Sequence, residues 1–267
     1  MNVKELLQKL DYFYEQGRLK DAEKLLVSSA ETATEDRNYS ALLTIYNEME
    51  GLYRTTGRAG KASEISDKAL ELISLMRLEN TVHHATTLQN GATANRVAGN
   101  NVKALDMYSR AAEIYKKLGY GNSYQMASLY NNISHIYQHQ NDHKTALEYL
   151  TLALKAISKL PENEAEIATT KICMSLSHMA MNNFDDAEKT LNDALSYYES
   201  DIGKNDGHYG SALSAKGEFL WRKKGYNNAI ITYEKALDVT LKRFGENYGC
   251  KIIRENIDKI RKEMETV

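Results

Sequence analysis

The sequence predicts an all-α protein in which six similar helix–turn–helix units stack into a solenoid. Three observations predict this class. A small residue recurs about every 42 positions, and a second small residue follows each of these anchors by seven positions. Residues that favour helices dominate, and the chain has a single proline, Pro161. A fixed period of this size indicates stacked units that each contact only their neighbours.

The repeat is defined by its anchors and by a turn that precedes them. The anchors are Ala22, Ala62, Ala104, Ala146, Ala187 and Ala229. Their partners are Ser29, Ala69, Ala111, Ala153, Ala194 and Ala236. Five positions before the anchors, most units have a residue that tolerates a turn: Gly17, Gly57, Gly99, Asn141 and Asn182, with Lys224-Gly225 in the last. Each unit is therefore expected to be a helix, a tight turn and a second helix.

In order, the expected units cover about residues 2–37, 38–79, 80–122, 123–161, 162–206 and 207–249. The first helices of the third and sixth units are the least regular, because Gly91, Asn95 and Lys216 stand where apolar residues are expected. Apolar residues at helical spacing follow the last unit: Ile252, Ile253, Ile257, Ile260 and Met264. They predict an amphipathic helix over residues 250–267 that caps the array.

The fourth unit shows the pattern most clearly. Its first helix carries Ala127, Tyr130, Ile133, Ser134 and Tyr137 on one face. Asn141-Asp142 interrupts the helix, and the second helix then presents Ala146, Leu147, Leu150, Ala153, Leu154 and Ile157. Leu160-Pro161-Glu162 ends the unit, since proline cannot continue a helix interior.

Composition excludes several function classes. The net charge is −2 with both signs interspersed, so we expect neither a nucleic-acid surface nor a charged tail. Cys173 and Cys250 have no metal or redox spacing, which favours a reducing compartment. The first residues lack a long apolar run, so we expect neither a secretory signal nor a membrane span. The expected location is the cytoplasm.

The segment Ala127-Ser-Leu-Tyr-Asn-Asn-Ile-Ser-His-Ile-Tyr137, followed by Ala146 and Ala153, resembles the tetratricopeptide repeat (TPR). The long period resembles the subclass in kinesin light chains and bacterial peptide-sensing regulators. Lys117-Leu118-Gly119 and the segment from Arg243 to Asn247 resemble the Leu-Gly loop of such repeats. The resemblance covers about residues 2–249. It implies a right-handed α-solenoid whose first helices line a concave groove.

The groove positions can be counted back from the anchors. Fifteen residues back are Leu7, Asn47, Gln89, Asn131, Ile172 and Ser214. Eleven back are Asp11, Gly51, Thr93, His135, Leu176 and Glu218. Eight back are Tyr14, Arg54, Arg96, Gln138, Met179 and Trp221. The predicted peptide-binding residues are Asn47, Arg54, Gln89, Arg96, Asn131, His135, Gln138, Met179 and Trp221.

These residue types suit an extended peptide. An amide can pair with both a backbone N–H and a C=O, and arginine can bind a carboxylate with two hydrogen bonds. The resemblance implies that Asn47 and Asn131 contact the ligand main chain, with Gln89 as a longer substitute. Ile172 and Ser214 depart from this pattern. We therefore predict a polar, cationic first half of the groove and an apolar second half.

A second interpretation stays open. Asn, Gln and Arg on a helix face are often solvated, or they form hydrogen bonds between repeats without any ligand. Met179 and Trp221 are equally consistent with packing under the last unit. His135, His139 and His143 are four apart, but the turn at Asn141-Asp142 separates the last one and no cysteine or carboxylate completes a site. We therefore expect no bound metal.

Three function classes follow. The leading prediction is a module that binds a protein or peptide, with an acidic or C-terminal carboxylate group as a candidate feature of that ligand. The alternative is a regulatory receptor for a short signalling peptide, although the first repeat begins at about residue 2 and leaves no room for a preceding output domain. An enzyme is not expected, because no phosphate loop, nucleophile elbow or paired-carboxylate motif is recognisable. No cofactor is expected, and the sequence does not predict the oligomeric state.

Overall fold

The computed structural model describes residues 2–266, which form thirteen α-helices and one short 3₁₀ helix with no strand. The α-helices are α1 (Val3–Glu15), α2 (Leu19–Glu35), α3 (Tyr39–Thr55), α4 (Ala59–Leu75), α5 (Val82–Val97), α6 (Asn101–Lys117), α7 (Tyr124–His139), α8 (His143–Ile157), α9 (Glu164–Ala180), α10 (Phe184–Tyr198), α11 (Tyr209–Arg222), α12 (Tyr226–Phe244) and α13 (Tyr248–Glu265). The 3₁₀ helix η1 (Gly203–Asn205) precedes α11. The predicted all-α solenoid of helix hairpins is confirmed.

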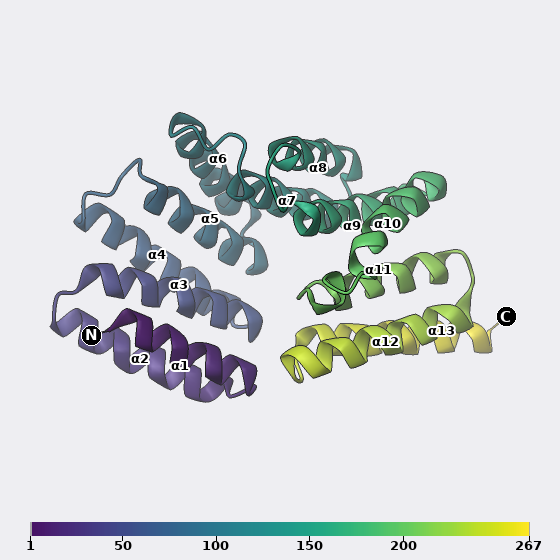
Figure 1. Cartoon of the computed structure of the whole chain (residues 1–267), viewed down its shortest axis with the longest axis horizontal. Coiled ribbons are helices and arrows are strands. Elements are labelled where there is room, and N and C mark those ends of the chain that lie inside the picture. Colours follow the sequence, from purple (N-terminus) through teal and green to yellow (C-terminus); the bar gives the residue numbers. More distant parts are fainter. Residues whose placement is uncertain (1, 267) are drawn as a thin grey trace. The chain divides into compact units, whose positions relative to one another are not determined.

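The chain divides into two compact units (Figure 1). The N-terminal unit ends at Gly121 and contains α1–α6, and the C-terminal unit begins at Asn122 and contains α7–α13. Within each unit consecutive helices pack as hairpins, and the first helices of neighbouring hairpins also touch: α3 with α5, α7 with α9, and α9 with α11. The exposed side of these first helices is called the inner face below. It is described separately for each unit.

The anchors explain why the two helices of a hairpin can pack closely. All six anchor alanines are fully buried, and so are the five alanine partners. A larger side chain at such a position overpacks the contact, which typically costs about 1–3 kcal/mol. The small residues therefore set the spacing of the helices in every hairpin.

Each hairpin turn uses the same backbone conformation. The residue five positions before the anchor has a positive φ in all six cases: Gly17 (63°), Gly57 (73°), Gly99 (85°), Asn141 (59°), Asn182 (61°) and Lys224 (60°). At the second turn the Gly57 N–H donates to the Arg54 carbonyl at 3.1 Å, and the Arg58 N–H donates to the Tyr53 carbonyl at 2.8 Å. This pair of bonds satisfies carbonyls that the helix end would leave unpaired.

The third hairpin forms although its first helix departs from the apolar pattern. A Cβ at Gly91 would lie 1.9 Å from Ser66 Oγ and 2.6 Å from Met107 Cε, so only glycine permits this approach of α5 to its neighbours. Asn95 is fully buried, but its Nδ2 donates to the Gly91 carbonyl at 2.9 Å and its Oδ1 accepts from Ser63 Oγ at 3.0 Å. Both residues therefore serve the packing of α5.

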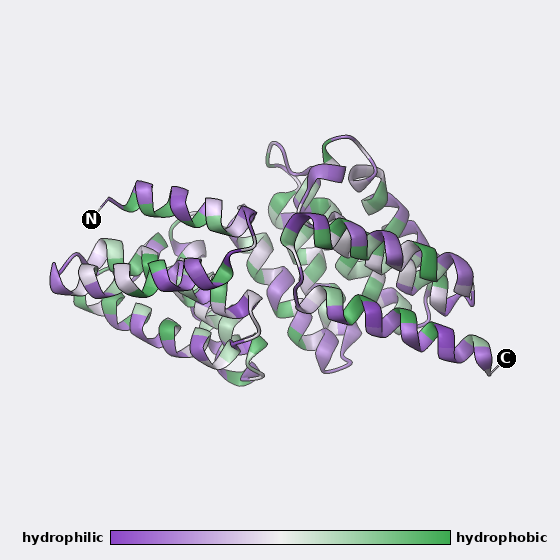
Figure 2. Ribbon diagram, turned by 90° about the horizontal axis from the view of Figure 1, so that it is seen from below, coloured by the Kyte–Doolittle hydropathy of each residue, from purple (hydrophilic) through white to green (hydrophobic). Residues whose placement is uncertain are grey.

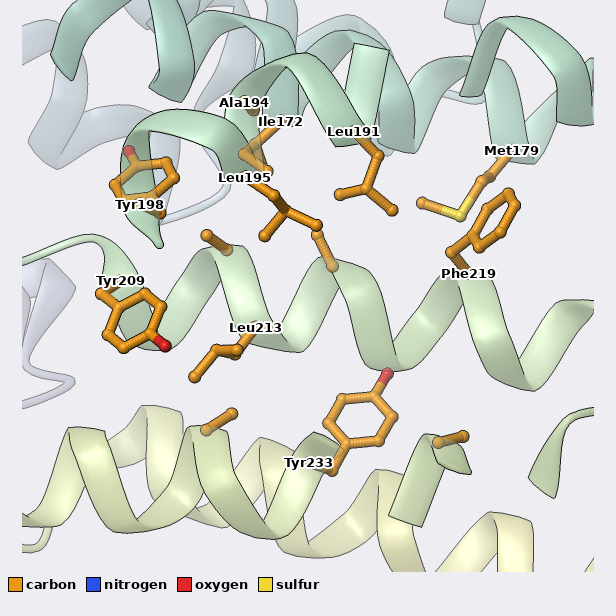
Figure 3. Close-up of a cluster of buried hydrophobic side chains, with 14 of the residues drawn as sticks. Ile172, Met179, Leu191, Ala194, Leu195, Tyr198, Tyr209, Leu213, Phe219 and Tyr233 are labelled. Atoms are coloured by element: carbon orange, nitrogen blue, oxygen red, sulfur yellow. The ribbon is translucent and has the colours of Figure 1, made fainter. Parts of the chain in front are cut away.

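The C-terminal unit is built around one apolar cluster (Figure 3). Ile172, Leu191, Leu195 and Leu213 interdigitate between α9, α10 and α11, with the rings of Tyr198, Tyr209 and Tyr233 around them. Ile253, Ile257 and Ile260 of α13 join this cluster. The rest of α13 is largely hydrophilic (Figure 2). The helix thus covers the last apolar face of the array, as a capping helix does.

Glu50 is a buried charge-bearing group in the core of the N-terminal unit. It is fully buried on α3, and neither of its carboxyl oxygens has a hydrogen-bond partner among the described residues. Burial raises the pKa of Glu50 to about 8, and Asp67 adds to the rise while Arg54 opposes it. Glu50 is therefore protonated and neutral at neutral pH.

The turn conformation predicts opposite effects for two substitutions. Gly57→Ala places a side chain at a positive φ and should lower the free energy of unfolding by about 1 kcal/mol. Lys224→Gly relieves the same conformation and should raise it by up to about 1 kcal/mol. Urea unfolding followed by circular dichroism measures both effects.

Gly60→Ala is the matched control, because Gly60 lies inside α4 with open space around it. It should raise the free energy of unfolding by about 0.5–1 kcal/mol. Equal effects of Gly57→Ala and Gly60→Ala would contradict the role of the left-handed turn.

The state of Glu50 predicts a pH dependence of stability. Its pKa in the folded protein lies above the reference value of 4.5, so its contribution to stability is fully present below that value and is lost as the pH rises through about 8. Relative to Glu50→Gln, the wild-type free energy of unfolding should fall by on the order of a few kcal/mol between about pH 5 and pH 9. Urea titrations across this range measure the difference. Glu64→Gln, an exposed change in the same unit, is the control, and a wild-type difference from Glu50→Gln that does not vary with pH would contradict the prediction.

Candidate functional site

The predicted binding residues lie on first helices in both units. Asn47 and Arg54 are on α3, and Gln89 and Arg96 are on α5, all in the N-terminal unit. The C-terminal unit holds the others: Asn131, His135 and Gln138 on α7, Met179 on α9 and Trp221 on α11. The two sets are described one unit at a time.

In the N-terminal unit, the amide predicted to contact a ligand already contacts the next repeat. Asn90 Nδ2 donates to Asn47 Oδ1 at 3.1 Å, and Arg54 Nη1 lies 3.5 Å from the Asn90 carbonyl. Asn90 therefore links α3 to α5. Asn90 directly follows Gln89, the position counted back from the anchor, and was not predicted as a site residue. Gln89 itself is partly buried beside it.

Arg54 and Arg96 form a positively charged pair on this inner face. Burial lowers the pKa of Arg54 and the charge of Arg96 lowers it further, while Glu50 and Tyr108 oppose the shift. Among the described residues no carboxylate lies within ion-pair distance of either guanidinium, and Arg96 Nε is buried without a hydrogen-bond partner. The positive charge of the pair is therefore not neutralised by an ion pair among the described residues of this unit.

Tyr108 supports this pair from α6. Its hydroxyl shares a hydrogen bond of 2.9 Å with Thr93 Oγ1. Burial raises the pKa of Tyr108, and the Thr93 hydrogen bond and the nearby arginines oppose that rise. The arrangement has the donors and the charge that bind an anionic group.

In the C-terminal unit, α7 is tied to α9 by its inner-face amides. Asn131 Nδ2 donates to Thr170 Oγ1 at 2.9 Å. Gln138 Nε2 donates to the Cys173 carbonyl at 2.9 Å and to Ser177 Oγ at 2.8 Å. These hydrogen bonds join neighbouring repeats without a ligand, which is the alternative that the sequence left open for these amides. Thr170 and Ser177 were not predicted, since both are small polar residues on α9 with no distinctive spacing.

His135 completes this contact but does not form a metal site with its neighbours. Its Nδ1 pairs with Gln138 Oε1 at 3.0 Å, and its Nε2 lies 4.0 Å from Cys173 Sγ. Residues 2–266 contain no group of three or more His, Cys, Asp or Glu that could hold a metal ion. Cys173 is buried on α9.

One pocket in the C-terminal unit has a volume of about 720 Å³. We call it the apolar pocket. Five of the counted groove positions line it: Gln138, Leu176, Met179, Ser214 and Glu218. Val239 and Phe244 of α12 and Ile252 and Ile253 of α13 close its other side. Repeat counting did not predict these four, because their positions depend on how the end of α12 and the capping helix pack against α11.

Two predicted apolar groove residues have structural roles. Met179 is 1% exposed and lies beside Phe219 in the core (Figure 3). It therefore supports the lining of the apolar pocket from the core side and has almost no accessible surface of its own. Trp221 packs against the same core, and its Nε1 donates to Glu263 Oε2 of α13 at 2.7 Å. Trp221 is not among the residues that line the pocket.

A second pocket of about 410 Å³ lies at the N-terminal end of α7. We call it the acidic pocket, because its lining includes Glu166 and Asp206 and no lysine or arginine. Asn131 and His135 line it as well. Burial acts to raise the pKa of Asp206, but hydrogen bonds from the His208 backbone and ring lower it overall, so Asp206 is ionised.

Comparison with known proteins agrees with this architecture. Residues 83–159 match the tetratricopeptide repeat family. Protein KINESIN LIGHT CHAIN-RELATED 2 of Arabidopsis thaliana is 26% identical over 169 residues, which are 58% of this chain and 26% of that protein. The chain therefore spans about a quarter of the length of this relative.

Two solved structures share the fold. BtubC (BKLC) from P. vanneervenii is 27% identical, with a TM-score of 0.64 over 73% of this chain and 78% of that one. A tetratricopeptide repeat protein from Parabacteroides merdae is 15% identical, with a TM-score of 0.52 over 97% and 98% of the two chains. No helix within residues 2–266 is long and apolar enough to cross a membrane. Folds of this kind generally mediate protein–protein interaction. The helix hairpins, the 42-residue period and these matches together show that this chain is similar to tetratricopeptide repeat proteins, with proteins of the kinesin-light-chain type among the matches.

Proposed function

We propose that this protein binds an extended peptide segment of a partner protein on its inner faces. The apolar pocket of the C-terminal unit is the observation that carries the proposal. The volume of about 720 Å³ is within the range of pockets that hold ligands, and a large apolar side chain of a partner would fill part of it. We also propose that the six hairpins are the six repeats whose bounds were predicted from the anchors, and that the protein acts in the cytoplasm without catalysis.

The lining of the apolar pocket favours an extended peptide as the ligand over the surface of a folded domain. Its walls come from three first helices, α7, α9 and α11, and from α12 and α13. Apolar side chains such as Leu176 and Phe244 occur with polar ones such as Gln138, Ser214 and Asn256. A peptide offers both a side chain for the hollow and main-chain groups for the polar positions.

The inner face of the N-terminal unit supports a second feature of the ligand. Arg54 and Arg96 are partly buried and lack a compensating carboxylate, so an acidic side chain or a C-terminal carboxylate would relieve their mutual repulsion. Their guanidiniums offer bidentate hydrogen bonds. Asn47 has a supporting role in this proposal, because its hydrogen bond with Asn90 positions α5 beside α3.

The apolar pocket predicts a site-blocking variant. Peptides are first selected from a random library displayed on phage with the wild-type protein. Ser211 is exposed and lines the pocket, so Ser211→Phe should fill it and weaken the selected peptides by about ten-fold or more. Fluorescence anisotropy with labelled peptides measures the affinity. Ser196→Phe, an exposed change on α10 outside the pocket, is the matched control, and equal binding by Ser211→Phe and wild type would remove the pocket from the proposal.

The arginine pair predicts a preference for acidic ligands. Replacing Arg54 and Arg96 together by Gln should abolish any preference of the N-terminal unit for peptides with a free C-terminal carboxylate over their amidated forms. The affinity of the wild-type protein for the carboxylate form should exceed that for the amidated form by about ten-fold, and this difference should shrink with added salt. Arg110→Gln removes the charge of an exposed arginine on α6 and serves as the control. Isothermal titration of matched acid and amide peptides decides the outcome, and an acid preference that persists in the double variant would exclude this role.

A further inference from the structure

A thiol, an imidazole and an amide follow one another between α7 and α9. Sγ of Cys173 on α9 lies 4.0 Å from Nε2 of His135 on α7, and Nδ1 of the same ring pairs with Oε1 of Gln138 at 3.0 Å. A base beside a nucleophile, with a third group that orients the base, is the arrangement that activates thiols in proteins. Peptide binding does not require such an arrangement.

The orientation of the Gln138 amide is set by a group that can only accept. Gln138 Nε2 donates to the Cys173 carbonyl at 2.9 Å and to Ser177 Oγ at 2.8 Å. A carbonyl oxygen has no proton to donate, so the nitrogen end of the amide must face it. The other end, Oε1, therefore faces the His135 ring.

This amide orientation decides which nitrogen of His135 carries the proton. Oε1 of Gln138 can only accept, so Nδ1 of His135 must donate to it. In a neutral imidazole the second nitrogen then has a lone pair and no proton. That nitrogen is Nε2, the ring atom that pairs with Cys173 Sγ. The thiol thus has a proton acceptor as its neighbour.

A small molecule can reach this contact from the acidic pocket. His135 lines that pocket, and so does Thr169, which precedes Cys173 by four residues on the same face of α9. The pocket has a volume of about 410 Å³, whereas a water molecule takes up about 30 Å³ in the liquid. Cys173 is 6% exposed. Its thiol is therefore open to a reagent of nearly the size of water and closed to large ones.

The second cysteine offers a comparison within the same unit. Cys250 on α13 is fully buried, and its Sγ donates to the Gly245 carbonyl at 3.7 Å. A backbone carbonyl does not take up a proton at neutral pH, so it cannot act as a base for this thiol. Cys173 differs from Cys250 both in its exposed fraction and in having an imidazole beside it.

The surrounding groups show why the imidazole matters. Glu166 and Asp206 line the acidic pocket, and their carboxylates disfavour a further negative charge nearby. Burial raises the pKa of Tyr198 on α10 to about 12, with Asp206 and Cys173 adding to the rise, so this neighbour of the thiol is neutral. The imidazolium that forms when His135 takes the thiol proton offsets the carboxylates and stabilises the thiolate.

We propose that Cys173 is an oxidation site at which His135 takes the thiol proton and hydrogen peroxide converts the thiolate to a sulfenic acid. The thiolate sulfur attacks one peroxide oxygen, so an S–O bond forms as the O–O bond breaks. The sulfur loses two electrons, and the peroxide gains them. The departing hydroxide takes the proton back from His135 and leaves as water, which restores the neutral imidazole. This reaction goes beyond the proposed peptide binding and does not depend on it.

The two cysteines of the wild-type chain provide the first test. The folded protein is treated with hydrogen peroxide, catalase removes the excess, and dimedone is added in urea to trap sulfenic acid at both positions. Peptide mass spectrometry should show the adduct at Cys173 forming at least about ten-fold faster than at Cys250. Peroxide treatment in urea should remove this difference. Equal rates in the folded protein, faster reaction of Cys250, or no adduct at either position would overturn the proposal.

Two histidine variants test the base in the same assay. His135→Gln should slow the oxidation of Cys173 about ten-fold at about pH 7, because the thiolate is the reacting form. The difference should shrink at about pH 9.5, where an ordinary thiol ionises without a base. His139→Gln, an exposed change on the same helix, should leave the rate unchanged.

A purely structural effect of His135 would not depend on pH. An unchanged rate in His135→Gln, or a slowing that is equal at both pH values, would therefore overturn the role of His135 as the base. Circular dichroism melting of both variants confirms that a changed rate does not come from unfolding. Phage selection and the Ser211→Phe variant test peptide binding separately, so either proposal can fail without the other.

Discussion

The close contact between the two helices of each hairpin is the constraint on which the rest of this structure depends. Six buried alanines stand at these contacts, and each follows a left-handed turn residue by five positions. The turn sets where the second helix starts, and the small side chain sets how near it lies to the first. Because both features repeat, the first helices of neighbouring hairpins meet in the same register, and the positions that form the inner face are determined.

The same architecture carries different chemistry in its two units. In the N-terminal unit, burial raises the pKa of Glu50, and neither Arg54 nor Arg96 forms an ion pair with a carboxylate among the described residues. In the C-terminal unit, carboxylates from α9 and from the segment before α11 gather at one pocket, and apolar side chains of α12 and α13 close another. Equivalent repeat positions thus differ in charge and polarity, and recognition by a solenoid depends on such differences.

Several polar residues of the inner face bind the repeats to one another. Asn47 pairs with Asn90, Asn131 with Thr170, and Gln138 with Ser177. An amide that contacts a ligand and an amide that joins two helices have the same spacing in the sequence, since both must stand on the exposed side of a first helix. Spacing could therefore place these residues on one face but could not assign their partners. Trp221 illustrates the same limit, because its partner Glu263 belongs to the capping helix, outside the repeat.

The sequence by itself determined the helix hairpins, their turns and the register of the inner face. These features follow from local rules, such as small residues at close contacts, turn formers at helix ends and apolar residues at helical spacing. Even Gly91 and Asn95, which broke the pattern, belong to a helix in the place that the period predicts. Only the tertiary structure decided the neutral state of Glu50, the pockets and the pairing of the inner-face amides. Each of these depends on desolvation or on contacts between segments far apart in the chain, and neither leaves a periodic signal in the sequence.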